Sequence, residues 1–254
     1  TYTPLARTFP SWVTILSGKM PDEHGARVNL YDLNVTSITD DLLTTHLKSK
    51  NYRTIYATDE RRFSNIDESY GFDMIIGPKI GVGDFIAGSI NDFPINNLAS
   101  MSPLGNLIFP YNRHNRANHV VYDPGHFANK LARTVLKQSG RPEPLFLASH
   151  LCLAHWPYLW RSSQQSNLIG PNILSSYQAA LHETDKQIGE ILSAIEKSAR
   201  PTLLILLSDH GEALGLEADA PHSRIKQTKA LEPLHGHGTN VASLSQYRVL
   251  LSFI

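Results

Sequence analysis

A carboxylate and an imidazole stand side by side at Asp209 and His210, where an apolar run ends in a group of polar residues. The pair offers a hard oxygen and a borderline nitrogen, a combination suited to Zn²⁺ or Mn²⁺. Gly211 follows and lets backbone pass close by without a side chain in the way. Taken alone, these residues are more typical of a turn at a strand end with an N-capping aspartate. The metal-site interpretation therefore depends on the rest of the chain.

Thr8 is the candidate nucleophile. Pro10 fits the first turn of a helix that Gly18 ends, so Thr8 falls at or just before a helix N-terminus. Free backbone N–H groups and the positive end of the helix dipole favour an anion at such a place. A hydroxyl there is well placed to attack phosphorus and lose its proton. The alternative is that Thr8 only caps the helix.

Histidines supply further candidates, since the chain has 12 of them. His150 and His155 follow an apolar stretch at residues 145–148. His235 and His237 are separated by one glycine and follow a polar stretch at 217–233. Histidines separated by glycine in a loop are seldom core residues. They indicate a metal or phosphate site, whereas for His150 a position in the core is an equally good interpretation.

The elements that position these residues indicate an α/β fold. The uninterrupted apolar run at 203–207 is typical of a strand buried on both faces of a parallel sheet. Further strands are expected at 52–58, 145–148 and 247–254. Helical spacing is found in the segments 10–18, 36–48, 127–136 and 175–197. We therefore predict a mostly parallel central sheet with helices on both faces, and ligands at the C-terminal edge of its strands.

Other polar segments are assigned no chemistry. Residues 59–62 are predicted to be a solvated loop, because mixed charge after a strand is ordinary. Asp123 and His126 are expected to form a turn and helix start in preference to a ligand pair. Residues 78–116 are rich in Gly, Pro and Asn and predict a long excursion over the sheet edge that carries substrate contacts.

Composition limits the classes of function. With 254 residues, 41% of them apolar and 18% charged, the chain is expected to form one domain over residues 1–254. Lys plus Arg equals Asp plus Glu at 23 each, so no overall field attracts nucleic acid, and no nucleic-acid partner is expected. Cys152 is the one cysteine, which leaves the redox compartment open. No apolar stretch reaches the ~18 to 20 residues that cross a bilayer.

The chain starts with threonine and ends on an apolar run at 247–254, from which we expect a fragment of a longer protein, truncated at both ends.

A family resemblance rests first on residues 8–18, which read Thr-Phe-Pro-Ser-Trp-Val-Thr-Ile-Leu-Ser-Gly and are followed by a proline and His-Gly. This segment resembles the nucleophile segment of the alkaline phosphatase and sulfatase superfamily. The phosphodiesterase branch has Thr-Phe-Pro-Asn at this place, and the sulfatase branch has Cys-x-Pro-Ser-Arg. Thr8 occupies the nucleophile position of both branches, and Ser11 occupies the sulfatase-like position.

The resemblance implies an alkaline phosphatase-like fold and roles for particular residues. His155, in His-Trp-Pro-Tyr, matches the histidine that meets the substrate's phosphate or sulfate. The His-Gly residues His237 and, close behind it, His235 match one that coordinates a metal or holds the substrate anion. Ser11 is expected among the substrate contacts. Metal ligands are expected from the three residues Thr8, Asp209 and His210.

The cofactor implied is one divalent metal ion, Zn or Mn, with Mg or Ca as alternatives. Family members supply a further acidic ligand upstream of the nucleophile, which this chain lacks, so the chain by itself is expected to bind metal weakly and to be inactive. The resemblance also implies a periplasmic or extracellular face and allows a membrane-anchored parent.

The activity implied is hydrolysis or transfer of a phosphoric ester through a threonine nucleophile, with a small-molecule or lipid-headgroup ester as substrate. Sulfatases use a cysteine or serine that is oxidised to formylglycine, and Thr8 cannot supply that aldehyde in the same way. Threonine occurs in phosphodiesterases and in phosphoethanolamine and phosphoglycerol transferases. Two alternatives stay open: sulfuric ester hydrolysis, and a non-catalytic binding module on the same fold. The oligomeric state is not indicated.

Overall fold

A computed structural model describes residues 1–29, 38–78, 102, 112–119, 121–165, 172–220 and 235–254. They form two compact units. The terminal unit is built from Thr1–His46, Phe63–Ile66 and Thr202–Ile254, and the central unit from Leu47–Arg62 and Asp67–Pro201. The prediction of a single domain over residues 1–254 stays a prediction.

The central unit contains a parallel three-stranded sheet in the order β2-β1-β3. Its strands are β1 (Arg53–Thr58), β2 (Met74–Ile76) and β3 (Leu145–His150). Parallel neighbours need crossover connections, and helices supply them in α/β proteins. The predicted α/β class is confirmed, and β1 and β3 fall where strands were predicted at 52–58 and 145–148.

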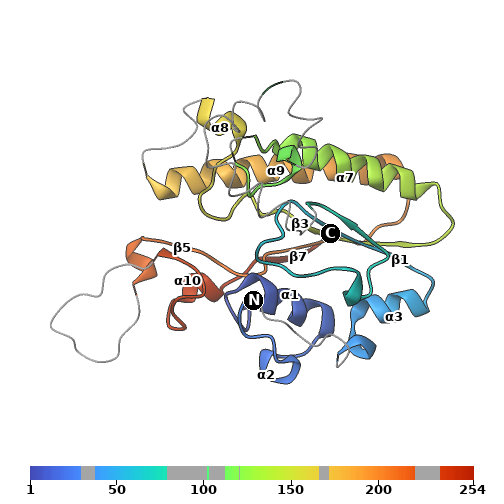
Figure 1. The fold of residues 1–254 in the computed structure, drawn as a ribbon, viewed down its shortest axis with the longest axis horizontal. Helices are drawn as coiled ribbons and strands as arrows, with labels where there is room; N and C mark the ends of the chain where they lie inside the picture. Colours follow the sequence, from blue (N-terminus) through green and yellow to red (C-terminus); the bar gives the residue numbers. More distant parts are fainter. Residues whose placement is uncertain (30–37, 79–101, 103–111, 120, 166–171, 221–234) are drawn as a thin grey trace. The chain divides into compact units, whose positions relative to one another are not determined.

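Two long helices cover one face of this sheet and run alongside each other (Figure 1). They are α7 (Pro124–Ser139) and α9 (Ile173–Ser198). Phe127 and Leu131 of α7 pack with Ile55 in the core of the unit. The helix begins where the Asp123 carboxylate accepts a hydrogen bond from the His126 backbone N–H, so the expected turn and helix start is confirmed.

Shorter elements complete the central unit: the 3₁₀ turns η3 (Glu68–Tyr70) and η4 (Asn112–His114) and the helix α8 (Arg161–Gln165). The helix α3 (Leu43–Ser49) carries the chain from the terminal unit into the central one.

The terminal unit combines segments from both ends of the sequence. Its helices and turns are α1 (Thr8–Ser17), α2 (Pro21–His24), η2 (Thr39–Asp41), η5 (Glu217–Asp219) and α10 (Leu244–Tyr247). Its strands form two antiparallel pairs, β4 (Ile205–Leu207) with β7 (Leu251–Phe253) and β5 (Ala213–Leu214) with β6 (His235–Gly236). In α1, Phe9, Val13 and Leu16 are buried at the spacing of one helix face.

The strand predicted at 203–207 differs from expectation. β4 covers only Ile205–Leu207, pairs antiparallel with β7, and is not buried on both faces, since Leu203 is 71% exposed and Ile205 46%. Within the described part of its unit, β7 is its one strand neighbour. An apolar run shows that a strand can be buried, but the neighbours that bury it are set elsewhere in the chain. The strand predicted at 247–254 is likewise shorter, because α10 and a connecting stretch precede β7.

The prediction of a solvated loop at 59–62 is wrong for its first two residues. Asp59 is fully buried and Glu60 nearly so. The Asp59 carboxylate accepts hydrogen bonds from the Cys152 backbone N–H, at 2.9 Å, and from the Tyr122 hydroxyl. Burial raises the pKa of Asp59, against the opposing effect of these two hydrogen bonds. The burial of Asp59 is thus explained by hydrogen-bond partners distant in the sequence, which local charge patterning does not indicate.

Several expectations lie partly outside the described residues. Most of the predicted excursion at 78–116 and most of the polar stretch at 217–233 are in the undescribed ranges. The helix expected at 36–48 is represented by η2 and α3. Of the helices that the structure describes, none combines the length and the apolar character needed to traverse a bilayer.

Candidate active site

Thr8 is the first residue of α1, and its side chain does not cap the helix. The N-cap residue is Arg7, which makes no side-chain capping bond. The Thr8 side chain is buried, and its Oγ1 lies 3.3 Å from Nε2 of His210, 202 residues later in the chain. The backbone N–H of Phe9, in the same first turn, donates to Asn29 Oδ1 at 3.0 Å. The Thr8 hydroxyl is therefore held at a histidine that the sequence marks as a metal ligand.

His210 directs a lone pair at this hydroxyl. Its Nδ1 lies 2.9 Å from the carbonyl oxygen of Gly211. Because a carbonyl only accepts, Nδ1 carries a proton, and Nε2 of the neutral ring is the acceptor. Asp209 Oδ2 lies 3.6 Å from the same Nε2, and Asp209 Oδ1 accepts a hydrogen bond from the His210 backbone N–H. The predicted ligands Thr8, Asp209 and His210 thus converge on one nitrogen.

Gly211 is required by the backbone packing beneath these residues. A Cβ built on it would lie 2.0 Å from the carbonyl oxygen of Ser245 and 2.9 Å from that of Arg248. The Gly211 N–H donates to the carbonyl oxygen of Gln246 at 2.9 Å. The turn after β4 therefore rests directly on α10, and this contact fixes the direction in which His210 points.

Glu212 and His237 form a second pair beside His210. His237 Nδ1 lies 2.7 Å from Glu212 Oε2, and the ring centroids of His237 and His210 are 4.1 Å apart. Sequence reasoning assigned no role to Glu212. Its signal was its place three residues after Asp209, in the same polar group at the strand end.

The arrangement separates the two candidate histidines of the His-Gly segment. His235 is exposed on β6 opposite Leu214, and its Cε1 lies 2.0 Å from where a Cβ on Gly215 would be. His237 is the one brought to His210. The geometry therefore favours His237 as the site residue, and His235 packs across the β5–β6 pair.

Arg7 links the two parts of the site and was also missed. Its Nη2 donates to the carbonyl oxygen of Gly238 at 2.8 Å. Gly238 has φ +64°, and a Cβ there would lie 2.9 Å from Cγ of Arg7. The residue before Thr8 thus holds the residue after His237, so the start of α1 and the His-Gly segment are fastened together.

Ser11 is hydrogen-bonded within the first turns of the chain, and its predicted substrate contact stays a prediction. Its hydroxyl is buried, donates to the carbonyl oxygen of Leu5 at 2.7 Å and lies 3.0 Å from Thr3 Oγ1. These bonds tie the first residues of the chain to α1.

His155 lies in the central unit, in the segment after β3. Arg116, which is buried, donates from Nη2 to the carbonyl oxygens of His155 and Trp156, the latter at 2.9 Å. His155 Nδ1 donates to the Trp156 carbonyl oxygen at 2.7 Å, so its neutral ring has the acceptor at Nε2. The predicted contact of His155 with substrate stays a prediction, while His150 ends β3 opposite Thr58 of β1.

The donor atoms fit a divalent cation. Thr8 Oγ1, Asp209 Oδ2 and His210 Nε2 are a mixed oxygen and nitrogen set of the kind that Zn²⁺ or Mn²⁺ accepts. A second set, His210, Glu212 and His237, also has ligand atoms within 4.8 Å of one another. The two sets share His210. In the second set the carboxylate already accepts the Nδ1 proton of His237, an arrangement that orients a histidine next to a metal site.

Comparisons with known proteins agree with this geometry. The sequence model of the sulfatase family matches residues 1–250, across both units, so the chain belongs to the sulfatase family. Over 88 residues it is 30% identical to the phosphoethanolamine transferase EptA of Helicobacter pylori, a match that covers 35% of this chain and 14% of the relative.

Solved structures show the same fold. The structure of Ps i-CgsB in complex with k-i-k-neocarrahexaose is 17% identical at a TM-score of 0.62 and covers 99% of this chain and 56% of that one. The lipoteichoic acid synthase LtaP of Listeria monocytogenes is 16% identical, TM-score 0.58, with 99% and 54% covered. The sulfatase PsFucS1 of Pseudoalteromonas sp. is 12% identical, TM-score 0.59, with 99% and 52% covered. The chain thus spans about half the length of these structures.

These findings confirm the resemblance inferred from the residues. The alkaline phosphatase and sulfatase superfamily consists of hydrolases and transferases, and its members bind divalent metal ions. The fold class and the superfamily are therefore established for this chain. The individual roles of Thr8, Asp209, His210, His155 and His237 remain predictions.

Proposed function

We propose that this chain carries the catalytic centre of a metal-dependent enzyme that hydrolyses or transfers a phosphoric ester, with Thr8 as the nucleophile. The observation that carries the proposal is the contact of 3.3 Å between Thr8 Oγ1 and His210 Nε2. It gathers the predicted nucleophile and a predicted metal ligand from opposite ends of the sequence at the start of α1.

Phosphorus is favoured over sulfur by the residue type at position 8. Threonine provides a hydroxyl that can attack phosphorus directly, whereas its extra methyl group prevents oxidation to the aldehyde of formylglycine. The matched relative of Helicobacter pylori is a phosphoethanolamine transferase, which supports a phosphorylated headgroup as the substrate class.

Each of the site residues would have a separate role in the reaction. Thr8 Oγ1 gives its proton to water and attacks phosphorus in line, so that an Oγ1–P bond forms, the bond to the leaving oxygen breaks, and that oxygen takes up a proton from water. Asp209 and His210 would hold a divalent cation, which when bound lowers the pKa of a coordinated hydroxyl and polarises a phosphoryl oxygen. His237, oriented by Glu212, would contact the equatorial oxygens. Water or an acceptor hydroxyl then attacks phosphorus and releases Thr8.

The test compares two esters and two substitutions. We expect the full-length protein that contains this chain, assayed with Mn²⁺ or Zn²⁺, to turn over a chromogenic phosphodiester, and Thr8→Ala to lower kcat by at least about 10³-fold. Thr8→Ser keeps the hydroxyl and is expected to retain much of the activity. Turnover unaffected by Thr8→Ala, or preference for the sulfate ester, would overturn the proposal.

The cation site has a test that needs no substrate. If Thr8, Asp209 and His210 hold the metal, Asp209→Ala lowers the bound Mn²⁺ or Zn²⁺ measured by equilibrium dialysis far more than Glu212→Gln does. If the second donor set holds it, the order reverses. Asp185→Asn, on the exposed side of α9, serves as a control for the loss of a carboxylate.

A further inference from the structure

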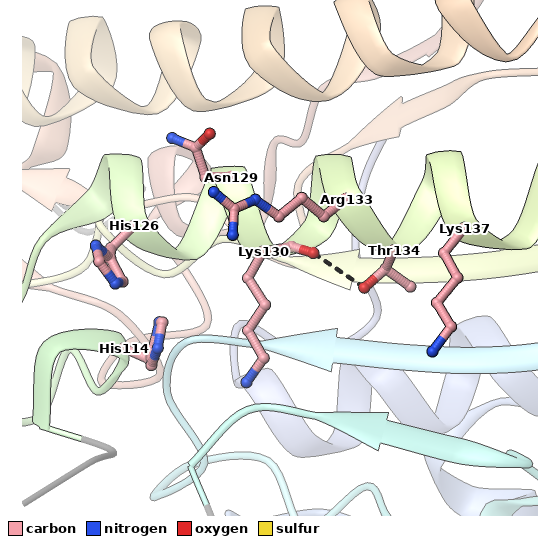
Figure 2. Close-up of a pocket in the computed structure, with 7 residues that line it drawn as sticks. All are labelled: His114, His126, Asn129, Lys130, Arg133, Thr134 and Lys137. Carbon is pink, nitrogen blue, oxygen red and sulfur yellow. Dashed lines mark hydrogen bonds between the residues drawn. The ribbon is translucent and has the colours of Figure 1, made fainter. Parts of the chain in front are cut away.

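The central unit contains a cavity of about 540 Å³ beside α7, here called the α7 cavity (Figure 2). His114 of η4 contributes to its lining, and the other lining residues all belong to α7. The cavity shares no residue with the candidate active site, so an inference about it does not depend on the proposed function.

The lining of the α7 cavity is cationic. It comprises Lys130, Arg133 and Lys137, the imidazoles of His114 and His126, and the neutral side chains of Asn129 and Thr134. It includes no carboxylate. Because the whole chain has 23 basic and 23 acidic residues, this composition is a local concentration and not a property of the surface at large.

The spacing of the cations aligns them. Residues 130, 133 and 137 follow one another by three and four positions and therefore lie along one side of the helix. At about 1.5 Å per residue, the first and last are separated by roughly 10 Å along the axis. In Figure 2, Lys130 and Lys137 extend from α7 to the side on which His114 lies. The cavity thus presents a row of positive charges to one space.

These charges have no acidic partners in the described part of the chain. The ion pairs among the described residues include none from Lys130, Arg133 or Lys137. Like charges at such spacing destabilise a helix. Two carboxylates lie in the neighbourhood: Asp123, which caps α7 and raises the pKa of His114 against the effect of Lys130, and Glu190, which lines an adjacent pocket with Arg133. A cluster of this kind stores repulsion that a bound anion would relieve.

His114 points to the same conclusion. Its ring lies against that of His126, with centroids 4.9 Å apart, and its Nδ1 is buried and has no hydrogen-bond partner among the described residues. Burial lowers the pKa of His114 to about 4, with Lys130 and His126 acting in the same direction. Burial also lowers the pKa of Lys130. A buried imidazole nitrogen that lacks a partner and lies close to a lysine is a group whose hydrogen bond a bound anion can complete by fixing the tautomer with the proton on that nitrogen.

We propose that the α7 cavity binds a phosphate or sulfate group of a ligand. Arg133 offers a planar fork for two oxygens, and Lys130 and Lys137 offer point charges. The imidazoles of His114 and His126 donate N–H groups. Asn129 and Thr134 already donate to the carbonyl oxygens of Gly125 and Lys130, so they shape the cavity instead of binding. The group is either a free anion or an ester on a larger ligand.

The first experiment is a titration of the protein by calorimetry with sodium phosphate and with sodium sulfate, at constant ionic strength set with chloride. We expect saturable binding of both anions, weakened about tenfold or more by Lys130→Gln and by Arg133→Gln. Lys50→Gln, an exposed lysine at the end of α3, is the matched control and should leave the affinity unchanged. No binding beyond that of chloride, or equal binding by all variants, would overturn the proposal.

A second readout is specific to the cavity. In an NMR titration, phosphate or sulfate should raise the pKa of His114, because a bound anion favours the charged imidazole. An unchanged His114 titration at saturating anion would contradict the assignment. If Lys130→Gln does not fold, Lys137→Gln, at an exposed position of the same row, tests the same point.

A sulfated oligosaccharide of defined length distinguishes the source of the group. Tighter binding than inorganic sulfate, with a steeper dependence on salt, identifies an ester on a larger ligand, and equal affinity identifies the free anion. Both results support the proposed chemistry. If the oligosaccharide still binds the double variant Lys130→Gln and Arg133→Gln, its binding site lies outside the α7 cavity and the proposal is overturned.

Discussion

His237 and Glu212 are joined by a hydrogen bond of 2.7 Å between Nδ1 and Oε2, and both side chains are largely buried. Since a carboxylate only accepts, the proton lies on Nδ1 of the ring. The carboxylate therefore selects one tautomer of His237 and fixes its orientation beside His210. Glu212 acts through His237 and is a positioning residue.

Glu212→Ala should lower kcat/KM by about 10- to 100-fold, the usual range for losing a partner that orients a site histidine. Glu212→Gln keeps an oxygen that accepts the Nδ1 proton and should lose less. The distinguishing measurement is ¹⁵N NMR of His237, which should show a shift away from the Nδ1–H tautomer in Glu212→Ala alone. Glu217→Gln, an exposed acid in η5, is the control. An unchanged tautomer in Glu212→Ala would remove the positioning role.

Gly211→Ala should damage the site through the backbone. The new methyl group would meet the Ser245 carbonyl oxygen at 2.0 Å, so that the turn or α10 must move. We expect a loss of about 1–3 kcal/mol in the free energy of unfolding, as for other overpacked positions. Metal affinity should fall with it, because His210 adjoins the displaced residue.

Gly189→Ala is a matched control for the same chemical change. Gly189 lies in α9, and a Cβ there meets nothing within 4 Å. Alanine in a helix interior should raise the free energy of unfolding by about 0.5–1 kcal/mol. If the two substitutions change the free energy of unfolding equally in chemical denaturation, the close contact at Gly211 does not contribute to stability.

Asp59 should make the stability of the protein depend on pH. Burial raises its pKa above the ordinary 3.8, so the folded state holds this proton more tightly than the unfolded state. The resulting stabilisation is present below pH 3.8 and is lost as pH rises through the folded-state value. Asp59→Asn does not titrate there, so its stability relative to the wild type should increase with pH.

The measurement is the free energy of unfolding of both proteins between pH 4 and 8, with the exposed Asp185→Asn as the control. Asp59→Leu should cost about 1–3 kcal/mol for each hydrogen-bonding group left without an acceptor, on Tyr122 and Cys152. A wild type and an Asp59→Asn variant with parallel pH profiles would contradict the assignment.

His114 should contribute a pH dependence of opposite sign. Its pKa is lowered from 6.5 to about 4 in the folded state, so the unfolded state binds the proton more tightly. Stability is then complete above pH 6.5 and declines as pH falls toward 4. In chloride buffer, His114→Gln should flatten the profile in this window, whereas the exposed His182→Gln controls for removing a histidine. A profile as steep in His114→Gln as in the wild type would refute this.

Local sequence patterns predicted where helices and strands lie better than they predicted which strands pair with each other. The strands β1 and β3 and the helices α7 and α9 lie where apolar runs and helical spacing placed them, because these signals are contained within each segment. The antiparallel pairing of β4 with β7 was not predicted, since it depends on residues more than 40 positions away. Asp59 was misjudged for the same reason, as its partners Tyr122 and Cys152 are 63 and 93 positions distant.

Site residues could be predicted from the sequence where their residue type and motif identify them. Thr8, Asp209 and His210 were recognised from their motifs, and the structure brings them together. Glu212 and Arg7 were missed because their importance comes from single contacts with His237 and Gly238, 25 and 231 positions away. Ser11 was assigned from its place in the motif, and its hydrogen bond to the Leu5 carbonyl oxygen, which the motif does not indicate, appears only in the structure.

The division of the sequence between the two units has a consequence for biosynthesis. The central unit comes almost entirely from Asp67–Pro201, so all its residues have been translated before Asp209. Thr8 and His210 are 202 residues apart, which a ribosome adding about 5–20 residues per second needs roughly 10–40 s to cover. Through that interval the nascent chain holds α1 without the turn it packs against. Premature termination before Ser208 would therefore release a polypeptide whose Thr8 hydroxyl never meets His210.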